Sequence, residues 1–143
     1  MKKLIFALFT SLSACSTTRN PLDDRIIGVW KSNRNLTIPT LRYPEGANPE
    51  DMENLKHVFG HLIVTYTKLT SSAVLPPMNE SPEWRSETTY RIKKRDKQSI
   101  TIRYYDYSDK THKLRKITFE GPDRYWIDLE DIEGREYFDR IKQ

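Results

Sequence analysis

Cysteine, histidine and glycine are scarce in this chain of 143 residues, which has one cysteine, three histidines and five glycines. A single cysteine has no disulfide partner within the chain, so stability must come from a packed core. His57 and His61 are four residues apart, but Gly60 is predicted to end a helix between them. No His-Glu-x-x-His motif is present, so solvent-facing or helix-capping histidines are favoured over a metal site. No cofactor is predicted, because no glycine-rich phosphate loop is present either.

The sequence also lacks the patterns that carry catalysis or nucleic-acid binding. It contains no Gly-x-Ser-x-Gly elbow for a nucleophile. Asp128, Glu130, Asp131 and Glu133 lie at a predicted strand end and turn, where a solvated edge is favoured over a general acid/base pair. Basic and acidic residues alternate along most of the chain, which argues against nucleic acid as a partner. The chain is therefore predicted not to be an enzyme.

The first apolar run begins at Leu4, directly after Met1-Lys2-Lys3, and gives way to small residues before Cys15. It is too short to span a bilayer as a permanent helix and has the layout of a secretory signal peptide. Removing residues 1–14 also removes two lysines, which lowers the formal charge from +4 to +2. The high isoelectric point of the whole chain therefore says little about its partners.

Leu12-Ser13-Ala14-Cys15 resembles a bacterial lipobox. The resemblance implies that Cys15 receives a diacylglyceryl group, that the signal is cut before it, and that the new amino terminus is acylated. Ser16 after the cysteine implies sorting to the outer membrane, facing the periplasm. The predicted organisation is a signal peptide over 1–14, a lipidated cysteine and tether over 15–22, and one domain over 23–143. The alternative is an ordinary cleaved signal followed by a structural cysteine.

Most of the domain has the two-residue period of β-strands. One helix is predicted over 49–59, with Asn48 as its cap, Pro49 at its first position and Gly60 as its end. Short connections force neighbouring strands to be antiparallel. We therefore predict a mainly β fold, a small antiparallel up-and-down barrel of about eight or nine strands. The strands are expected over 26–32, 36–38, 62–67, 71–75, 85–94, 99–107, 112–120, 124–130 and 135–141.

The candidate ligand-binding residues are aromatic side chains expected inside the barrel: Tyr66, Tyr90, Tyr104, Phe119 and Trp126. Such a set either lines a pocket or packs as ordinary core. Arg103 and Arg115 are the natural partners for an anionic headgroup if either points inward. In the last strands Tyr125 and Ile127 compete with Trp126 for the inside, and the pattern leaves that register open.

Gly28-Val29-Trp30 on the first strand, followed by the meander and by Arg135-Glu136-Tyr137-Phe138-Asp139-Arg140, resembles the lipocalins, and in particular small bacterial lipocalin-like lipoproteins. In that family the tryptophan closes one end of the barrel and an arginine of the last strand packs across it. The resemblance implies these roles for Trp30 and Arg140. The helix departs from the lipocalin pattern, because it lies early in the chain instead of after the barrel.

Two functions are expected. The first is a membrane-tethered binding module that holds a small hydrophobic or amphiphilic ligand in the barrel. The second is a protein-interaction lipoprotein, either an envelope assembly factor or an inhibitor of the immunity type, with a filled core. In the second, the loop over 75–83 and the neighbouring Trp84 would contact an envelope protein.

Overall fold

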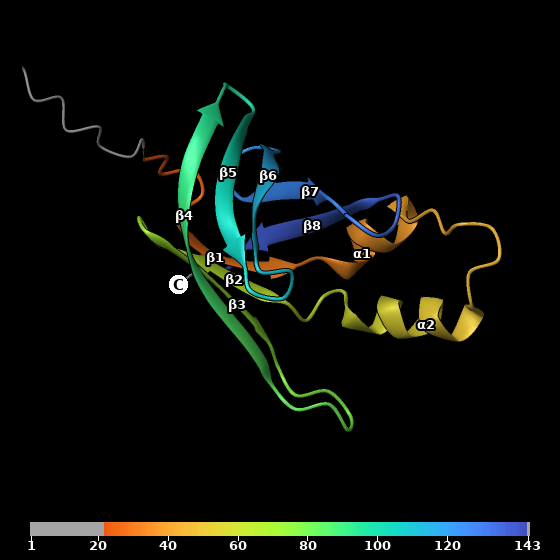
Figure 1. Ribbon diagram of the computed structural model, residues 1–143. Helices are drawn as coiled ribbons and strands as arrows, with labels where there is room; N and C mark the ends of the chain where they lie inside the picture. The colour runs from red at the N-terminus through yellow and green to blue at the C-terminus, as the bar shows by residue number, and fades with distance from the viewer. Residues whose placement is uncertain (1–21, 143) are drawn as a thin grey trace, which may run out of the picture.

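The computed structural model describes residues 22–142, and these form one closed barrel. Eight antiparallel strands follow one another around it, and the last strand pairs with the first (Figure 1). This confirms the predicted fold class. The elements are β1 (Gly28–Ser32), α1 (Arg34–Thr37), a 3₁₀ turn (Ile38–Thr40), α2 (Pro49–Val58), β2 (Ile63–Tyr66), β3 (Thr70–Leu75), β4 (Trp84–Arg95), β5 (Ser99–Asp106), β6 (Thr111–Phe119), β7 (Arg124–Asp128) and β8 (Arg135–Arg140).

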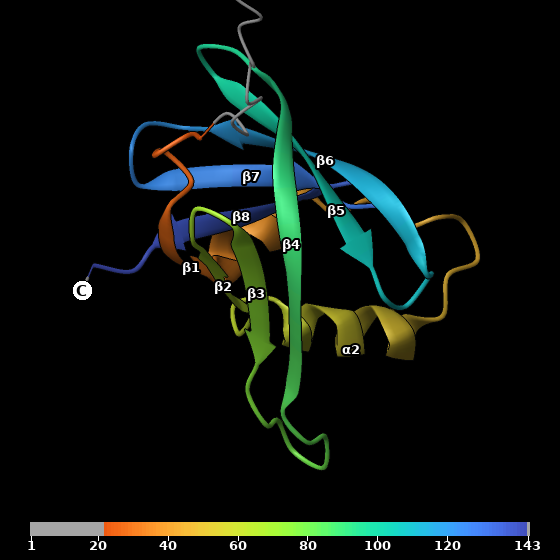
Figure 2. The ribbon, with the colours of Figure 1, turned by 60° about the vertical axis from the view of Figure 1, so that its left-hand side comes forward.

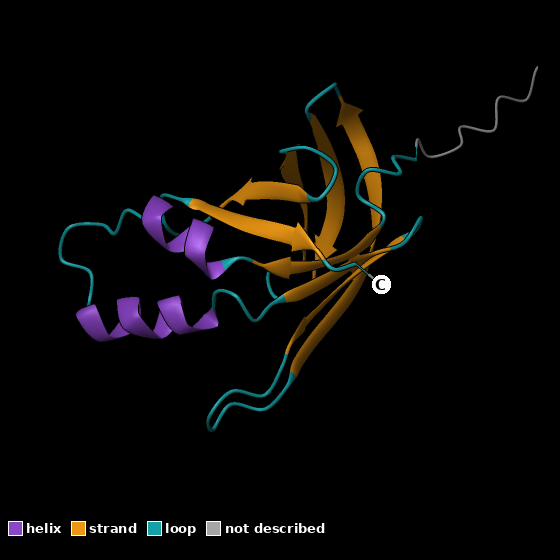
Figure 3. Ribbon diagram, turned by 180° about the vertical axis from the view of Figure 1, so that it is seen from behind, coloured by secondary structure: helices purple, strands orange, loops and turns teal. Residues whose placement is uncertain are grey.

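Helix α2 forms where the capping pattern places it. The Asn48 side chain accepts a hydrogen bond from the Glu50 amide at 2.9 Å, Pro49 occupies the first turn, and Glu50 and Asp51 supply negative charge there. Gly60 follows with φ +92°, a conformation that favours glycine. No residue of α2 is fully buried. The helix therefore lies beside the end of the barrel and contributes little to its core (Figure 3).

The expected short strand over 36–38 is wrong, because this segment forms α1 and the 3₁₀ turn. Asn33 starts the helix by accepting a hydrogen bond from the Leu36 amide at 3.1 Å. Thr37 is fully buried, and its hydroxyl accepts a hydrogen bond from the Tyr137 amide of β8 at 3.0 Å. These contacts hold the segment in helical turns despite the β-branched side chains of Thr37 and Ile38.

The core lies inside the barrel, on the alternate residues of each strand. Ile92, Ile102 and Ile117 come from β4, β5 and β6, and Tyr125 and Phe138 come from β7 and β8. The rings of Tyr125 and Phe138 stack with their centroids 4.9 Å apart. On the strands that carry these residues, burial of the inner positions favours the observed register, because a slip of one residue would turn this apolar face to water.

One end of the barrel is plugged. The Arg140 guanidinium carbon lies 4.1 Å from the centre of the Trp30 ring. Its nitrogens donate to the backbone oxygens of Ile27 at 2.7 Å and Arg25 at 2.8 Å. Trp30 is fully buried and donates from its indole nitrogen to the Ile26 oxygen at 2.8 Å. We call this the closed end, and the described chain begins beside it.

The opposite end carries the two helices and the β3–β4 connection, which extends beyond the barrel (Figures 1 and 2). We call it the open end. The carboxyl end of β5 and the amino end of β6 meet here, as do those of β7 and β8. The closed and open ends therefore differ in both shape and covering elements.

Candidate functional site

A cavity lies inside the barrel because two neighbouring strands carry small residues on their inner faces. Ser71 of β3 is directly opposite Thr88 of β4, and Ala73 is opposite Ser86. All four line a cavity of about 200 Å³. Side chains of this size do not reach the far wall, so the interior is left partly unfilled at this point. Trp84 is two residues from Ser86 on the same face of β4. It stands at the rim of the cavity and is half exposed.

The far wall of this cavity carries a guanidinium group. Arg115 of β6 lines the cavity, and its side chain is 35% exposed. Its Nη2 donates to the Tyr104 hydroxyl at 2.9 Å, and its guanidinium carbon lies 4.8 Å from the centre of that ring. Within residues 22–142 this is the one side-chain hydrogen bond that Arg115 makes. A guanidinium has five N–H donors, so Arg115 keeps donors with which it can bind a further acceptor.

The nearest carboxylate to Arg115 belongs to Glu130, whose Oε1 lies 4.0 Å from Nη2. Its other oxygen is bound by Lys113 at 3.1 Å. The Lys113 ammonium also contacts Asp106 at 2.8 Å and Asp109 at 2.5 Å, and the hydrogen bond that it donates to Asp106 is the main reason why the pKa of Lys113 is raised. Glu130 is therefore shared with a stronger cationic partner, and the positive charge of Arg115 stays incompletely neutralised.

A second compartment of about 320 Å³ adjoins the first, and both are lined by Tyr66, Trp84 and Arg115. Tyr66 is almost fully buried and meets the edge of Tyr125 at a centroid distance of 6.5 Å. Burial raises the pKa of the Tyr66 hydroxyl and of the Tyr125 hydroxyl. Both phenols are neutral at physiological pH and add hydrogen-bonding groups to the wall of the compartment. The wall also carries Asp128, Glu130 and Glu136.

Glu136 of β8 is a buried carboxyl group at the edge of this compartment. Its Oε1 accepts a hydrogen bond from the Ser32 hydroxyl at 2.7 Å, and that hydroxyl in turn accepts one from the Gly60 amide at 3.0 Å. Burial raises the pKa of Glu136, although Ser32 and Arg115 oppose the shift. Glu136 thus links the barrel wall to the segment that follows α2.

The compartment continues into an apolar groove of about 530 Å³ beneath α2. Leu62, Leu129 and Glu136 line both spaces. On the helix side the groove is formed by Met52, Leu55 and Val58, the three-four-spaced apolar stripe of α2. The interior is therefore connected to a wide apolar opening at the open end.

The structure separates the predicted interior residues into three groups. Tyr66 and Tyr104 line the cavity. Tyr90 and Phe119 lie in or against the core nearer the closed end, where the Tyr90 hydroxyl donates to the Thr67 oxygen at 2.6 Å and the Arg25 guanidinium covers the Phe119 ring at 4.8 Å. Burial raises the pKa of Tyr90 to about 12.

Trp126 does not lie inside the barrel, so its assignment to the interior is wrong. Its neighbours Tyr125 and Ile127 are buried, and alternation therefore turns Trp126 to the outer face. There the Arg135 guanidinium covers its ring at 3.8 Å. Tyr125 takes the inner position because it stacks on Phe138 and meets the edge of Trp30 at 4.8 Å.

Of the two arginines singled out in the sequence, Arg115 points into the cavity and Arg103 lies exposed on the outer face. The sequence patterns did not identify Glu136 or the small inner residues of β3 and β4 as parts of the site. The signal for the small residues is their two-residue spacing at Ser71 and Ala73, and at Ser86 and Thr88, within otherwise bulky strands. Nothing local distinguishes Glu136 from a surface glutamate.

The remaining candidates lie apart from the cavity. His57 and His61 are both exposed. Among residues 22–142 no three side chains of His, Cys, Asp or Glu are grouped to hold a metal ion. Cys15 is outside the described residues. None of the helices within 22–142 has the length and apolarity required to cross a membrane.

Comparison with known proteins gives no assignment. No family model, no curated protein and no solved structure matches the chain.

Proposed function

We propose that this protein is a lipocalin-like lipoprotein of the bacterial envelope that binds a small amphiphilic molecule with an anionic group. The observation that carries the proposal is the partly open barrel interior with the Arg115 guanidinium on its wall. The apolar part of the ligand is held among Tyr66, Tyr125 and Ile127. No covalent chemistry is involved, because burial of apolar surface and one charged contact suffice for binding.

The chemistry of Arg115 favours a carboxylate or a phosphate as the anionic group. Both have oxygens spaced for two parallel hydrogen bonds from one guanidinium. Tyr104, which already accepts a hydrogen bond from Arg115, fixes the direction of the fork. The combined interior of about 200 Å³ and 320 Å³ falls in the range of small-molecule sites.

Anchoring through Cys15 would place the barrel on a membrane with its opening directed away. The described chain begins at Leu22 beside the closed end, where the Leu22 oxygen accepts a hydrogen bond from Arg95 at 3.1 Å. Residues 16–21 reach at most about 3.3–3.6 Å each. The tether therefore holds the closed end near the lipid, and the ligand enters from the periplasmic side.

Native mass spectrometry of a protein spanning residues 20–143 tests the proposal, since all eight strands and the plug of the closed end lie within 22–142. We expect a mass excess that disappears on denaturation. Ser86→Trp, which fills the cavity, should abolish the excess. Glu87→Trp, on the outer face of the same strand, should leave it unchanged. A cavity variant that still carried the full excess would contradict the proposed site.

The anionic group is tested by a second matched pair. Arg115→Met removes the inward guanidinium, and Arg103→Met removes an exposed one on the neighbouring strand. We expect only Arg115→Met to weaken binding of a fluorescent anionic amphiphile, by about tenfold or more. Equal loss of binding in both variants would point to general charge attraction.

The anchor is tested separately, because Cys15→Ser should no longer incorporate a labelled lipid precursor in cells.

The protein-interaction alternative rests on a different observation, the half-exposed apolar stripe of α2 and the exposed Trp84 at the rim. In that function the partner would cover the groove, and the barrel interior would stay empty. Leu55→Asp should then abolish partner capture from envelope extracts, while Ser86→Trp should not. The reverse pattern would favour the small-molecule function.

A further inference from the structure

The outer face of β4, β5 and β6 carries positive charge in adjacent rows. Arg91 of β4 is directly opposite Arg103 of β5. In the next row Lys94 is opposite Thr101, which is opposite Lys116 of β6. We call the full set the basic face. Its members are Arg91, Lys93, Lys94, Arg103 and Lys116 on the strands and Lys97 in the turn between β4 and β5, all exposed. Arg95 is opposite the buried Ile100, so it lies on the inner side of β4 at the closed end and is not a member.

These cations make no direct ion pair with the acids of the described domain. Within residues 22–142 none of them forms an ion pair with a carboxylate. Asp96, the acid in the turn between β4 and β5, accepts hydrogen bonds from the Gln98 and Ser99 amides at 2.8 Å and keeps its negative charge, so it offsets part of the charge of the face. Two arginines directly opposite each other in an antiparallel pair are destabilising. The fold thus tolerates a concentrated charge that does not stabilise it.

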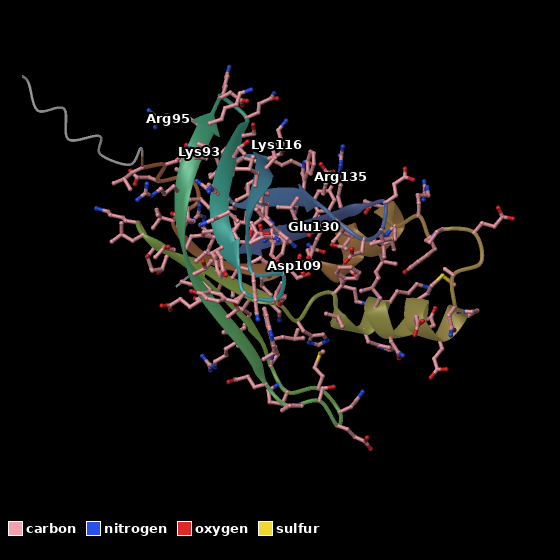
Figure 4. The ribbon with its side chains drawn as sticks, in the orientation of Figure 1. Lys93, Arg95, Asp109, Lys116, Glu130 and Arg135 are labelled. Carbon is pink, nitrogen blue, oxygen red and sulfur yellow. The ribbon has the colours of Figure 1, made fainter. Side chains whose placement is uncertain are left out.

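The position of the basic face indicates which kind of surface it binds. Arg95 hydrogen-bonds the backbone at Leu22, and Arg25 binds the backbone oxygens of Asp96 and Lys97 at 3.0 Å and 2.9 Å. The face therefore adjoins the segment that leads to Cys15. Lys93 and Lys116 lie toward one end of the strands, whereas Asp109 and Glu130 lie toward the other (Figure 4). Asp23, Asp24 and Asp96 lie beside Lys97 at the first of these ends, so the cations outnumber the acids on the face without being free of them.

We infer that the basic face binds the headgroups of an anionic phospholipid surface. Clusters of four to eight basic residues next to a membrane attachment point are typical of such binding. Leu114, opposite Arg103 in the same row and 63% exposed, adds an apolar side chain suited to the interface. The inference rests on the proposed lipid anchor at Cys15, which brings the face to a membrane. The surface is distinct from the barrel interior, so the inference does not depend on the proposed ligand.

Co-sedimentation with vesicles tests this inference on the protein spanning residues 20–143, which lacks the lipid. We expect binding to phosphatidylcholine vesicles that contain phosphatidylglycerol, no binding to phosphatidylcholine alone, and loss of binding as salt is raised. Arg91→Gln with Arg103→Gln should weaken the partition by about fivefold for each cation removed. The matched control is Arg85→Gln with Arg135→Gln, which makes the same charge change away from the face and should have little effect.

Three results would overturn the inference. The first is equal binding to neutral and anionic vesicles. The second is an equal loss in the control variant, which would show that net charge alone is responsible. The third is a single-stranded oligonucleotide that binds more tightly than the vesicles and depends on Arg91 and Arg103, which would assign the face to nucleic acid. Arg115→Met should not change vesicle binding. A result that contradicts the proposed ligand site can therefore be distinguished from one that contradicts the proposed role of the basic face.

Discussion

Gly28, Trp30 and Arg140 form one packed unit at the closed end. A Cβ atom added at Gly28 would lie 2.5 Å from Arg140 Nη1, and the φ of Gly28 is +138°. Glycine is therefore required both by the backbone conformation and by the close approach of the guanidinium. Contact of that guanidinium with the Trp30 ring contributes about 0.5–2 kcal/mol. This geometry explains the Gly-x-Trp pattern of the first strand.

Gly28→Ala is expected to destabilise the fold by about 1–3 kcal/mol, because the added methyl group strains the backbone and displaces Arg140. Urea unfolding measures the loss. Arg140→Met removes the clashing atoms, so Gly28→Ala should cost less in that background. A coupling of about 0.5–3 kcal/mol between the two changes is expected. Strict additivity would show that the guanidinium is not what excludes a side chain at Gly28.

Glu136 makes stability depend on pH. Burial raises its pKa above the ordinary 4.5, so the folded protein holds this proton more tightly than the unfolded chain does. The contribution of Glu136 to the free energy of unfolding should therefore fall as pH rises from about 4.5 through the folded pKa, and remain lower above it. Glu136→Gln, which still accepts from Ser32, should be more stable than the parent at neutral pH.

The difference in unfolding free energy between Glu136→Gln and the parent, measured from acid to neutral pH, isolates this contribution. Glu87→Gln, at an exposed outer position of β4, is the control and should show no such trend. A parent protein that gains stability relative to Glu136→Gln as pH rises would contradict the assignment of a raised pKa.

At the scale of elements, the hairpins and α2 could be predicted because their signals are local. Turn residues, the two-residue period and the cap at Asn48 each act over a few positions. The segment at Leu36 could not, because its helical turn depends on Asn33 and on a contact from Thr37 to β8, about a hundred residues away. Trp126 was misplaced for the same reason, since the Tyr125 stack on Phe138 decides that register.

The candidate site was predicted only in part. Tyr66, Tyr104 and Arg115 were recognised as residue types suited to an amphiphile, and all three line the cavity. The cavity itself arises from pairing Ser71 with Thr88 and Ala73 with Ser86. A cavity is a property of side chains that face one another across strands, and single-strand patterns do not contain it.

Helix α2 should contribute little to stability, because none of its residues is fully buried. Leu55→Ala is expected to cost below about 1 kcal/mol, whereas Ile102→Ala in the barrel core should cost about 2–5 kcal/mol. Urea unfolding of both variants makes the comparison. Amide exchange should also be faster in α2 than in β5. Comparable costs at the two sites would show that α2 is packed firmly against the barrel.

At the scale of the whole molecule, the basic face and the opening of the barrel lie toward different ends. The basic face adjoins the closed end and the start of the described chain, where Arg25 binds the Lys97 backbone oxygen. The open end carries the acids Asp106, Asp109 and Glu130 around Lys113. An anionic surface would attract the basic face. The proposed tether at Cys15 and the proposed role of the basic face therefore favour the same orientation, with the opening of the barrel away from the membrane.

This orientation predicts which parts of the full-length protein, lipidated at Cys15 as proposed, lie close to the bilayer. Gln98→Cys, in the turn between β4 and β5, and Ser81→Cys, in the β3–β4 connection at the open end, each provide one exposed site for a maleimide fluorophore. In vesicles that contain brominated phosphatidylglycerol, the fluorophore at position 98 should be quenched and the one at position 81 should not. Arg91→Gln with Arg103→Gln should reduce the quenching at 98 while the lipid still holds the protein on the vesicle. Stronger quenching at position 81 would instead show that the opening of the barrel faces the membrane. The ligand would then be taken directly from the bilayer.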